Sequence, residues 1–403
     1  MQTPGCTCGL SPSWGAPLDD NREPRLLIRA DNLSVSLSLP PWMLWALFAA
    51  LVAVVVAIMA GPRPAGEVDM SIPFEKASNV PEQEVIEGDA FKRYTEWFTS
   101  QGVRCHAWLY LPTAAATAAA DGSPAGNEPG GDGALPPPVV LMAHGLGAQK
   151  DMGLSKYAEA FAAMGMAALV FDYRGFGGSD GKPRNLAHPW RHVEDYQAAI
   201  DHVKASGLGG RVNPSRMALW GTSFAGGHVL KVAATRGGDI KAVVSQVPHL
   251  DGRAASKKAV RERGLGLTLR MVYAVLRDLL RSSLGMGAGY IRIVGIKGDG
   301  GLALMSLAED QYAQYFSKHP KEYLGGWRNM APARLGSMIG LYSPLQDVPK
   351  VEMPVLFVAA ENDTLCPAEK VREAAELAPR GSSVIKDCSH FDIYGGEVRL
   401  LLL

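Results

Sequence analysis

The stretch MALWGTSFAGG, residues 217–227, decides the fold of this 403-residue chain. Four apolar residues typical of a buried strand lead into Ser223, which has small neighbours on either side, and a helical pattern follows. A serine on such a strand-to-helix turn is held in a strained backbone, and bulk two residues away would clash with the adjacent chain. Ala225 stands where a second glycine is usual. The stretch therefore predicts a reactive serine at the end of a strand.

Short apolar runs recur on both sides of this stretch, and helical patterns lie between most of them. The runs are 139–143, 167–172, 241–246, 354–360 and 383–387. Alternating strands and helices require right-handed crossovers and form a mainly parallel sheet with helices on both faces. Two aromatic and β-branched runs within residues 84–111 predict an antiparallel pair at one edge of that sheet. The fold class is therefore α/β and doubly wound.

Two segments interrupt this alternation. Residues 249–350 have the pattern of helices rather than strands, which predicts a helical lid above the strand ends. Residues 112–138 are rich in Ala, Gly and Pro without periodicity, which predicts a low-complexity loop. The core of the domain is then expected at 81–248 and 351–403.

Polar side chains follow two further strands, at the edge where ligands bind in such a sheet. Glu361-Asn362-Asp363 follows one strand and Cys388-Ser389-His390 follows the other. A serine hydroxyl is a poor nucleophile until an imidazole accepts its proton, and that imidazole needs a carboxylate to fix its tautomer. We predict Ser223, Asp363 and His390 as the catalytic residues. Glu361 remains the rival acid.

The loops after two other strands supply the remaining candidates. His144-Gly145-Leu146-Gly147 follows the strand at 139–143. The backbone N–H groups of Leu146 and Phe224 are predicted to form the oxyanion hole. His144 itself is predicted to be structural. Asp172 and Arg174 are predicted to form a structural pair.

Six motifs together resemble the α/β-hydrolase superfamily, close to its serine aminopeptidase-like and polyketide acyltransferase- or thioesterase-like branches. They are HGLGAQK (144–150), DYRGFGGSDG (172–181), GTSFAGGH (221–228), SQVPHLDG (245–252), ENDTLCP (361–367) and SHFDIY (389–394). The resemblance covers residues 80–395 and implies an eight-stranded sheet, a Ser-Asp-His triad and a helical lid that shapes the acyl pocket. Relatives usually close with a long amphipathic helix, whereas this sequence continues only to Leu403, so we expect one sheet face to be partly uncovered.

A separate apolar segment lies near the N-terminus. Residues 42–60 read WMLWALFAALVAVVVAIMA without a charge, which is long enough for a helix to cross a hydrocarbon core. A cleaved signal peptide is disfavoured because the run begins far from residue 1 and no small-x-small site follows it. We predict a disordered tail at 1–41, a transmembrane helix at 42–61 and a linker at 62–80. Three arginines before the span place the catalytic part on the non-cytosolic side.

Charge and motif content exclude several classes of function. Forty Lys and Arg balance forty Asp and Glu, so no nucleic-acid partner is expected. The glycine clusters match no nucleotide-binding motif, and no cofactor is expected. His188 and His192 are four apart, but Pro189 lies between them and no third ligand follows, so no metal is expected. Cys366 and Cys388 are either a disulfide or two buried thiols.

These predictions combine into one expected function. The chain is expected to be a membrane-anchored serine hydrolase that cleaves an ester, thioester or amide of a small-molecule or lipid-like acyl substrate through an acyl-enzyme on Ser223. Two alternatives stay open. One is an acyltransferase that uses the same three residues, and the other is a catalytically silent hydrolase fold that serves as a binding protein.

Overall fold

The computed structural model describes residues 25–30, 33–38, 40–61, 80–121, 135–317 and 327–395. The chain divides into two compact units, Met1–Gly61 and Pro62–Leu403, and each is described by itself. Nearly all of the predicted linker at 62–80, and the chain beyond residue 395, lie outside the described residues.

The N-terminal unit contains a hairpin and a helix. β1 (Arg25–Ala30) pairs antiparallel with β2 (Leu33–Ser38), and α1 spans Pro41–Ala60. The prediction of a disordered tail at 1–41 is therefore wrong for these two strands. The strict alternation of apolar and serine residues in LSVSLS is a strand pattern that composition alone obscures.

The apolar helix itself coincides with α1, but its predicted role is corrected. Within the described part of the chain, no helix combines the length and apolar character that crossing a membrane demands. The predicted membrane localisation on the non-cytosolic side is wrong on this finding, and anchoring by residues 42–61 is not supported.

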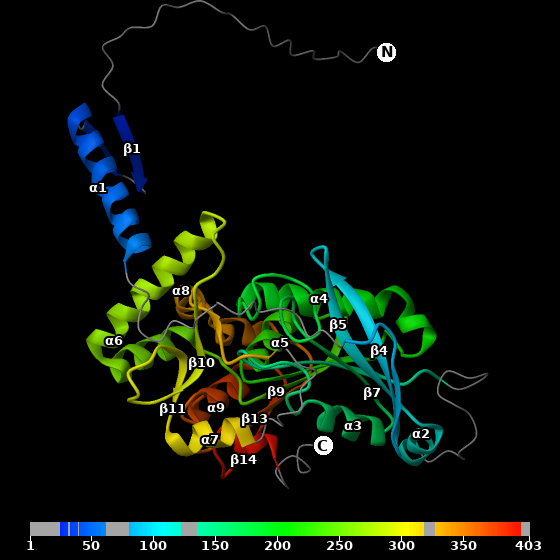
Figure 1. Ribbon diagram of the computed structural model, residues 1–403. Helices are drawn as coiled ribbons and strands as arrows, with labels where there is room; N and C mark the ends of the chain where they lie inside the picture. Colours follow the sequence, from blue (N-terminus) through cyan, green and yellow to red (C-terminus); the bar gives the residue numbers. More distant parts are fainter. Residues whose placement is uncertain are drawn as a thin grey trace, which may run out of the picture. The chain divides into compact units, whose positions relative to one another are not determined.

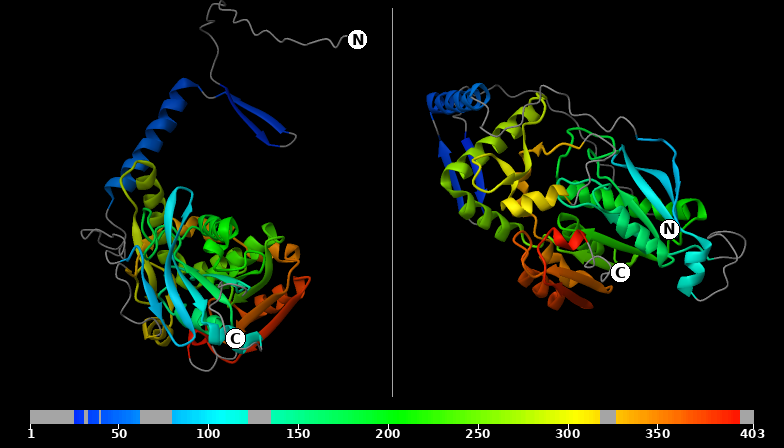
Figure 2. Two further views of the ribbon diagram at one scale, coloured as in Figure 1. Left: turned by 90° about the vertical axis from the view of Figure 1, so that its right-hand side faces the viewer. Right: turned by 60° about the horizontal axis from the view of Figure 1, so that its bottom comes forward.

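The second unit is built on a nine-stranded sheet with the order β14-β13-β9-β8-β6-β7-β5-β4-β3. In chain order its strands are β3 (Val85–Glu87), β4 (Phe91–Ser100), β5 (Val103–Pro112), β6 (Val139–Ala143), β7 (Ala167–Phe171), β8 (Met217–Thr222), β9 (Ile240–Gln246), β13 (Val355–Ala360) and β14 (Gly381–Lys386). The strands from β14 to β7 are parallel, and β5, β4 and β3 continue the sheet antiparallel. The left view of Figure 2 shows the two edges, with β4 in cyan and β14 in red. The mainly parallel sheet is confirmed, and the short β3 is the strand that the predicted eight did not include.

Helices cover both faces of this sheet, as predicted (Figure 1). α4 (Pro189–Gly210), α5 (Phe224–Thr235) and α9 (Ala368–Leu377) pack into one core cluster. α3 (Ser155–Ala163) packs against the other face, where Tyr157 and Phe161 contact strand residues such as Val170. The short apolar strands are buried on both sides because each face has its own helical layer.

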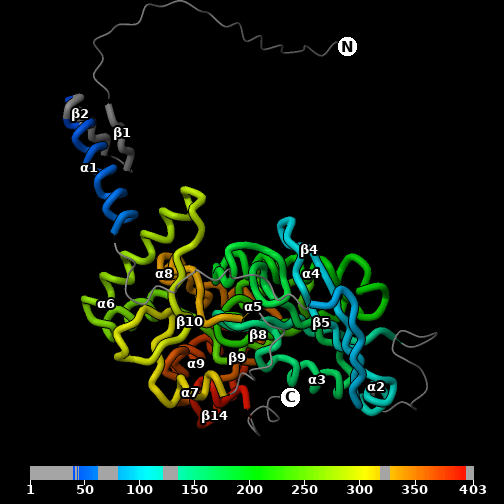
Figure 3. The backbone as a smooth tube through the Cα atoms, viewed as in Figure 1, coloured from blue at the N-terminus to red at the C-terminus, as the bar shows by residue number. Residues whose placement is uncertain are grey.

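A long segment is inserted between β9 and β13. It comprises α6 (Gly252–Ser283), β10 (Tyr290–Ile296), β11 (Ala303–Leu307), α7 (Glu309–Ser317), β12 (Ala331–Pro332), α8 (Leu335–Met338) and the short turns η1 (Ile339–Leu341) and η2 (Pro344–Lys350). The expectation of helices alone is wrong, because β11, β10 and β12 form a small sheet of their own. YIRIVGI and ALMSL are rich in apolar and β-branched residues and lie on either side of a glycine-rich turn, which favours strands. Figure 3 shows these elements grouped on one side of the large sheet.

The predicted low-complexity loop also contains an element. α2 spans Ala114–Asp121, where a run of alanines has high helix propensity. Residues 122–134 of this loop lie outside the described residues.

Candidate active site

Ser223 occupies the turn between β8 and α5 in a strained conformation. Its φ of 56° and ψ of −116° are unusual for a residue other than glycine. The backbone around it holds this geometry, since the Ser223 N–H donates to the Gln246 carbonyl at 2.8 Å and the His249 N–H donates to the Ser223 carbonyl at 2.9 Å. A Cβ on Gly221 would lie 2.3 Å from the Ala225 carbonyl oxygen, so only glycine fits there.

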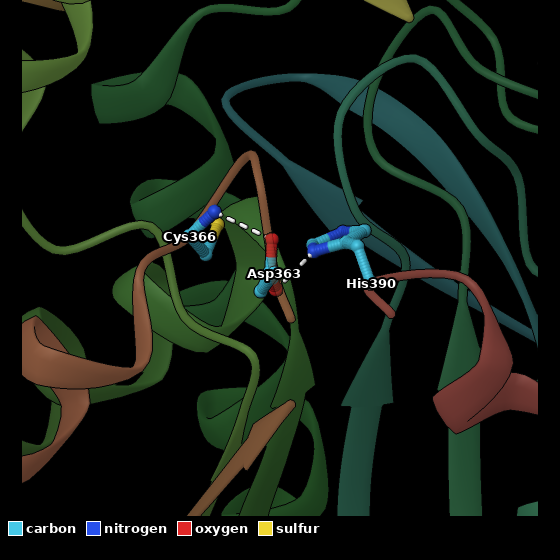
Figure 4. Close-up of side chains that lie close together, drawn as sticks. All are labelled: Asp363, Cys366 and His390. Atoms are coloured by element: carbon cyan, nitrogen blue, oxygen red, sulfur yellow. Dashed lines mark hydrogen bonds and ion pairs between the residues drawn. The ribbon is translucent and has the colours of Figure 1, made fainter. Parts of the chain in front are cut away.

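His390 and Asp363 are in direct contact. His390 Nδ1 lies 2.6 Å from Asp363 Oδ2, and both residues are buried. The other carboxylate oxygen, Oδ1, accepts the backbone N–H of Leu365 at 2.8 Å and that of Cys366 at 2.7 Å. An ionised carboxylate only accepts hydrogen bonds, so it places the imidazole proton on Nδ1 and leaves Nε2 as an acceptor. Figure 4 shows Asp363 lying between Cys366 and the ring of His390.

Glu361, the rival acid, points elsewhere. It is exposed and pairs with Arg372 at 2.5 Å. The structure therefore brings Asp363, and not Glu361, to the imidazole of His390.

Ser223 and His390 line one pocket, together with Gly145 and Leu146. A Cβ built on Gly145 would lie 3.0 Å from Ser223 Cβ and 3.5 Å from Ser223 Oγ, so the loop after β6 runs directly beside the serine. Phe224 is the first residue of α5, where backbone N–H groups have no partner within the helix. The four stretches from which sequence analysis drew candidate residues thus meet at one place.

The rest of the pocket wall is largely apolar. Met152, Leu154 and Phe391 come from the domain core. Met305 of β11 and Tyr315 of α7 come from the inserted segment. The indole N–H of Trp327 donates to the Gly147 carbonyl at 2.8 Å, which ties the inserted segment to the loop beside Ser223. The pocket therefore suits a small group with an apolar portion.

A buried ion pair lies behind the loop that follows β6. Lys150 Nζ is 2.5 Å from Asp172 Oδ2, and the Lys150 backbone N–H donates to Asp172 Oδ1 at 2.8 Å. Burial opposes ionisation of Asp172, but the charge of Lys150 outweighs it and lowers the pKa of Asp172 to about 2. Asp172 thereby anchors the far end of the segment 144–150.

The predicted pairing of Asp172 with Arg174 is wrong. Arg174 turns toward α4, where its Nε lies 2.5 Å from Asp195 Oδ1 and its Nη2 lies 2.6 Å from Glu194 Oε2. Lys150 was missed because a lysine side chain is rarely buried. Its place at the end of the HGLG loop was the available signal.

Four further histidines surround the turn at Ser223 on the buried side. His192 stacks on Tyr173 with ring centroids 3.9 Å apart, and its Nδ1 lies 3.3 Å from His228 Nε2. Burial lowers the pKa of His192 and of His228 well below the ordinary value, and it lowers the pKa of His144 and of His249 to about 4. His188 instead caps the start of α4, so it does not share a metal site with His192. These imidazoles are neutral packing groups at pH 7.

Cys366 lies next to the site, and the structure decides between the two readings of its sulfur. It is buried in the turn that follows Asp363, and neither Cys366 nor Cys388 forms a disulfide. Burial raises the pKa of the Cys366 thiol well above its ordinary value.

Comparison with known proteins agrees with this geometry. Residues 135–391 match the family of serine aminopeptidases, S33. The chain is 34% identical over 300 residues to the quorum-quenching protein AidA of Acinetobacter baumannii, covering 74% of this chain and 88% of the relative. It is 27% identical over 267 residues to the thiohydrolase apmlB of Arthrinium phaeospermum, covering 64% of this chain and 82% of the relative.

Solved structures show the same fold. The α/β hydrolase GrgF from Penicillium sp. sh18 aligns with a TM-score of 0.60 at 24% identity, over 77% of this chain and 95% of that chain. The hypothetical protein PA2218 from Pseudomonas aeruginosa aligns with a TM-score of 0.63 at 20% identity, over 83% and 96%. The predicted resemblance, fold class and assignment as a hydrolase are confirmed, and the chain belongs to the serine aminopeptidase S33 family of α/β-hydrolases.

Proposed function

We propose that this hydrolase cleaves the ester or thioester bond of a small acyl substrate through an acyl-enzyme on Ser223. One observation carries the proposal. An imidazole held by a buried carboxylate at 2.6 Å lines the same pocket as a serine in a strained strand-to-helix turn. An amide is the slower substrate for the same chemistry, because it has the poorer leaving group.

Each residue has a distinct task in the proposed mechanism. His390 Nε2 accepts the proton of the Ser223 hydroxyl as the oxygen attacks the acyl carbon, and it then donates that proton to the leaving group. Asp363 keeps the ring in the required tautomer and stabilises the imidazolium ion. The backbone N–H groups of Leu146 and Phe224 hold the oxyanion, and losing one such donor costs typically about 10²–10³ in rate. Water then repeats the attack on the acyl-enzyme.

The pocket supports a substrate with an apolar acyl group. Met152, Leu154, Met305 and Phe391 line it. Of the two described histidines in its wall, His390 is the one within hydrogen-bonding distance of a carboxylate. An apolar wall excludes water from the reacting carbonyl, which strengthens the hydrogen bonds to the oxyanion. The relatives named thiohydrolases are in keeping with a thioester.

A covalent probe tests this proposal directly. A fluorophosphonate should label the wild-type chain on Ser223, and Ser223→Ala should abolish both the labelling and the hydrolysis of a panel of acyl esters and thioesters, by at least about 10³-fold. Ser215→Ala, at the exposed turn before the same strand, is the matched control and should keep full activity. Hydrolysis that persists in Ser223→Ala would exclude the proposed nucleophile. Absence of both labelling and hydrolysis in the wild type would favour a binding protein.

Acyl transfer is the second candidate, because relatives with partial matches are named as a polyketide transferase and an acyltransferase. The two candidates share the acyl-enzyme and differ only in what attacks it. Alcohol and amine acceptors added to the hydrolysis assay should leave the product distribution unchanged for a hydrolase. A transferase would divert most of the acyl group to the acceptor.

A further inference from the structure

Three different metal-ligating groups meet beside the proposed nucleophile. The donor atoms of Asp363, Cys366 and His390 all lie within 4.8 Å of one another, and all three residues are buried. A thiolate, an imidazole nitrogen and a carboxylate oxygen are the protein ligands that Zn²⁺ takes. The proposed acyl transfer uses the carboxylate and the imidazole but gives the thiol no task.

We propose that this cluster is an inhibitory site for a thiophilic divalent cation, with Zn²⁺ as the ion. The inference rests on the proposed function, since the ion would act by capturing His390. Mg²⁺ and Ca²⁺ are excluded as occupants because a thiolate and an imidazole are poor ligands for hard cations.

The local backbone presents two of the ligands together. The N–H groups of Leu365 and Cys366 both donate to Asp363 Oδ1, so a single tight turn carries the carboxylate and the thiol. Asp363 Oδ2 remains on the side of His390 (Figure 4). Because the backbone N–H of Cys366, and not its side chain, donates to the Asp363 carboxylate, replacing the Cys366 side chain removes the sulfur without removing this support of Asp363.

The required adjustment is small. With Zn–N near 2.0 Å and Zn–S near 2.3 Å, ligand atoms around a tetrahedral ion lie roughly 3.5 Å apart. The distance between His390 Nδ1 and Asp363 Oδ2, now 2.6 Å, must increase by about 1 Å. The Cys366 sulfur, now within 4.8 Å of a donor atom of each of these residues, must move closer to both. A fourth position is then left for water.

Binding would switch the tautomer of the base. The ion takes the lone pair of Nδ1, so the ring proton moves from Nδ1 to Nε2, and the thiol proton leaves to solvent as the Zn–S bond forms. One proton is released for each ion, and no electrons are transferred. With a proton on Nε2, His390 has no lone pair to accept the hydroxyl proton of Ser223. Inhibition therefore follows from the position of one proton.

The first experiment measures ester hydrolysis of the full chain against free Zn²⁺, with Mg²⁺ as the control ion and EDTA to reverse the effect. Each variant is compared with its own metal-free rate. Cys366→Ala should raise the half-inhibitory Zn²⁺ concentration at least about 10-fold, because losing even a group that only supports a metal ligand typically costs about 10–100-fold in affinity. Cys388→Ala, which removes a thiol that is not part of the cluster, should behave like the wild type. Equal inhibition of Cys366→Ala and wild type would overturn the proposal, as would a wild type that Zn²⁺ does not inhibit.

The second experiment observes the metal without using activity. Cys6 and Cys8 offer another thiol pair, so the measurement is made in a Cys6→Ser/Cys8→Ser background. Co²⁺ in place of Zn²⁺ should give a thiolate-to-cobalt charge-transfer absorption, and Cys366→Ala should remove it. If the absorption appears but the wild type is never labelled by the fluorophosphonate, the metal site stands and the proposed catalytic function fails. If labelling occurs and no absorption appears, only the metal site fails.

Discussion

Two buried aspartates follow parallel strands at the same edge of the sheet, and their partners differ. Asp172 follows β7 and pairs with Lys150, whereas Asp363 follows β13 and pairs with His390. His390 lines the pocket, and Lys150 and Asp172 are not among the residues that form its wall. The first pair holds the loop at 144–150 in place, since both the side chain and the backbone N–H of Lys150 donate to Asp172. An imidazole that gains and loses a proton suits the second pair to proton transfer. The role of each aspartate therefore depends on the residue with which it pairs.

The largest expected effect comes from Asp363→Asn. An amide in this position favours the wrong imidazole tautomer, and the rate should fall by about 10³–10⁴ in kcat, as for the equivalent change in a serine protease. Steady-state ester hydrolysis measures it. The matched control is Glu361→Gln, which alters an exposed carboxylate on the same turn and should change kcat less than about twofold. If Glu361→Gln were the slower variant, our choice of acid would be wrong.

The Lys150–Asp172 ion pair should affect the stability of the fold more than the rate of the reaction. Asp172→Asn leaves the Lys150 ammonium buried without a counter-charge, and the free energy of unfolding should fall by about 3–5 kcal/mol. Urea denaturation measures the loss. Lys204→Met, which breaks an exposed pair with Asp239, is the control and should cost no more than about 1 kcal/mol. A loss for Asp172→Asn as small as that of the control would remove the distinction between the two aspartates.

A double substitution separates the charge from the packing. Lys150→Met/Asp172→Asn removes both buried charges and keeps a side-chain oxygen that can accept a backbone N–H at this position, so it should recover much of the stability lost in Asp172→Asn alone. The measurement is again urea denaturation, combined with kcat on one ester. If the Lys150–Asp172 pair has only a structural role, kcat should recover together with stability. A double variant that is stable but still inactive would show that the charges themselves act in the reaction.

As the pH falls, the buried histidines should destabilise the fold at a higher pH than the Lys150–Asp172 ion pair does. The pKa of His144 and of His249 is lowered to about 4 by burial, so above pH 6.5 both the folded and unfolded states leave them neutral. Below that pH these histidines are protonated in the unfolded state but stay neutral in the folded state. Each histidine should therefore lower the free energy of unfolding by about 1.4 kcal/mol per pH unit down to pH 4. Asp172, with a pKa of about 2, contributes its stability above its ordinary pKa of 3.8 and loses it only as the pH falls toward 2.

Urea denaturation between pH 7 and pH 4 checks this order of events. His249→Gln should flatten the dependence of stability on pH relative to the wild-type chain. A slope equal to that of the wild type would mean that burial of His249 does not control its protonation.

Much of the fold was predictable because its signals are local. The runs at 139–143 and 217–222 are short and mostly apolar. This is the pattern expected of a strand that is buried on both faces of a sheet. Ser223, Asp363 and His390 could be proposed together because each follows a strand, and the carboxyl ends of parallel strands meet at one edge. The strands β10 and β11 were missed because they lie inside an insertion, where no alternation with helices guides their assignment.

The amino-acid sequence by itself determined the order of strands and helices and the residue types at the strand ends, since periodicity and turn chemistry act between near neighbours. Only the tertiary structure decided which groups touch: Lys150 with Asp172, His390 with Asp363 rather than Glu361, and Cys366 within reach of both members of the second pair. Such contacts join residues far apart in the chain. Their geometry depends on how the sheet twists and how the loops pack over its edge, which no spacing in the sequence records.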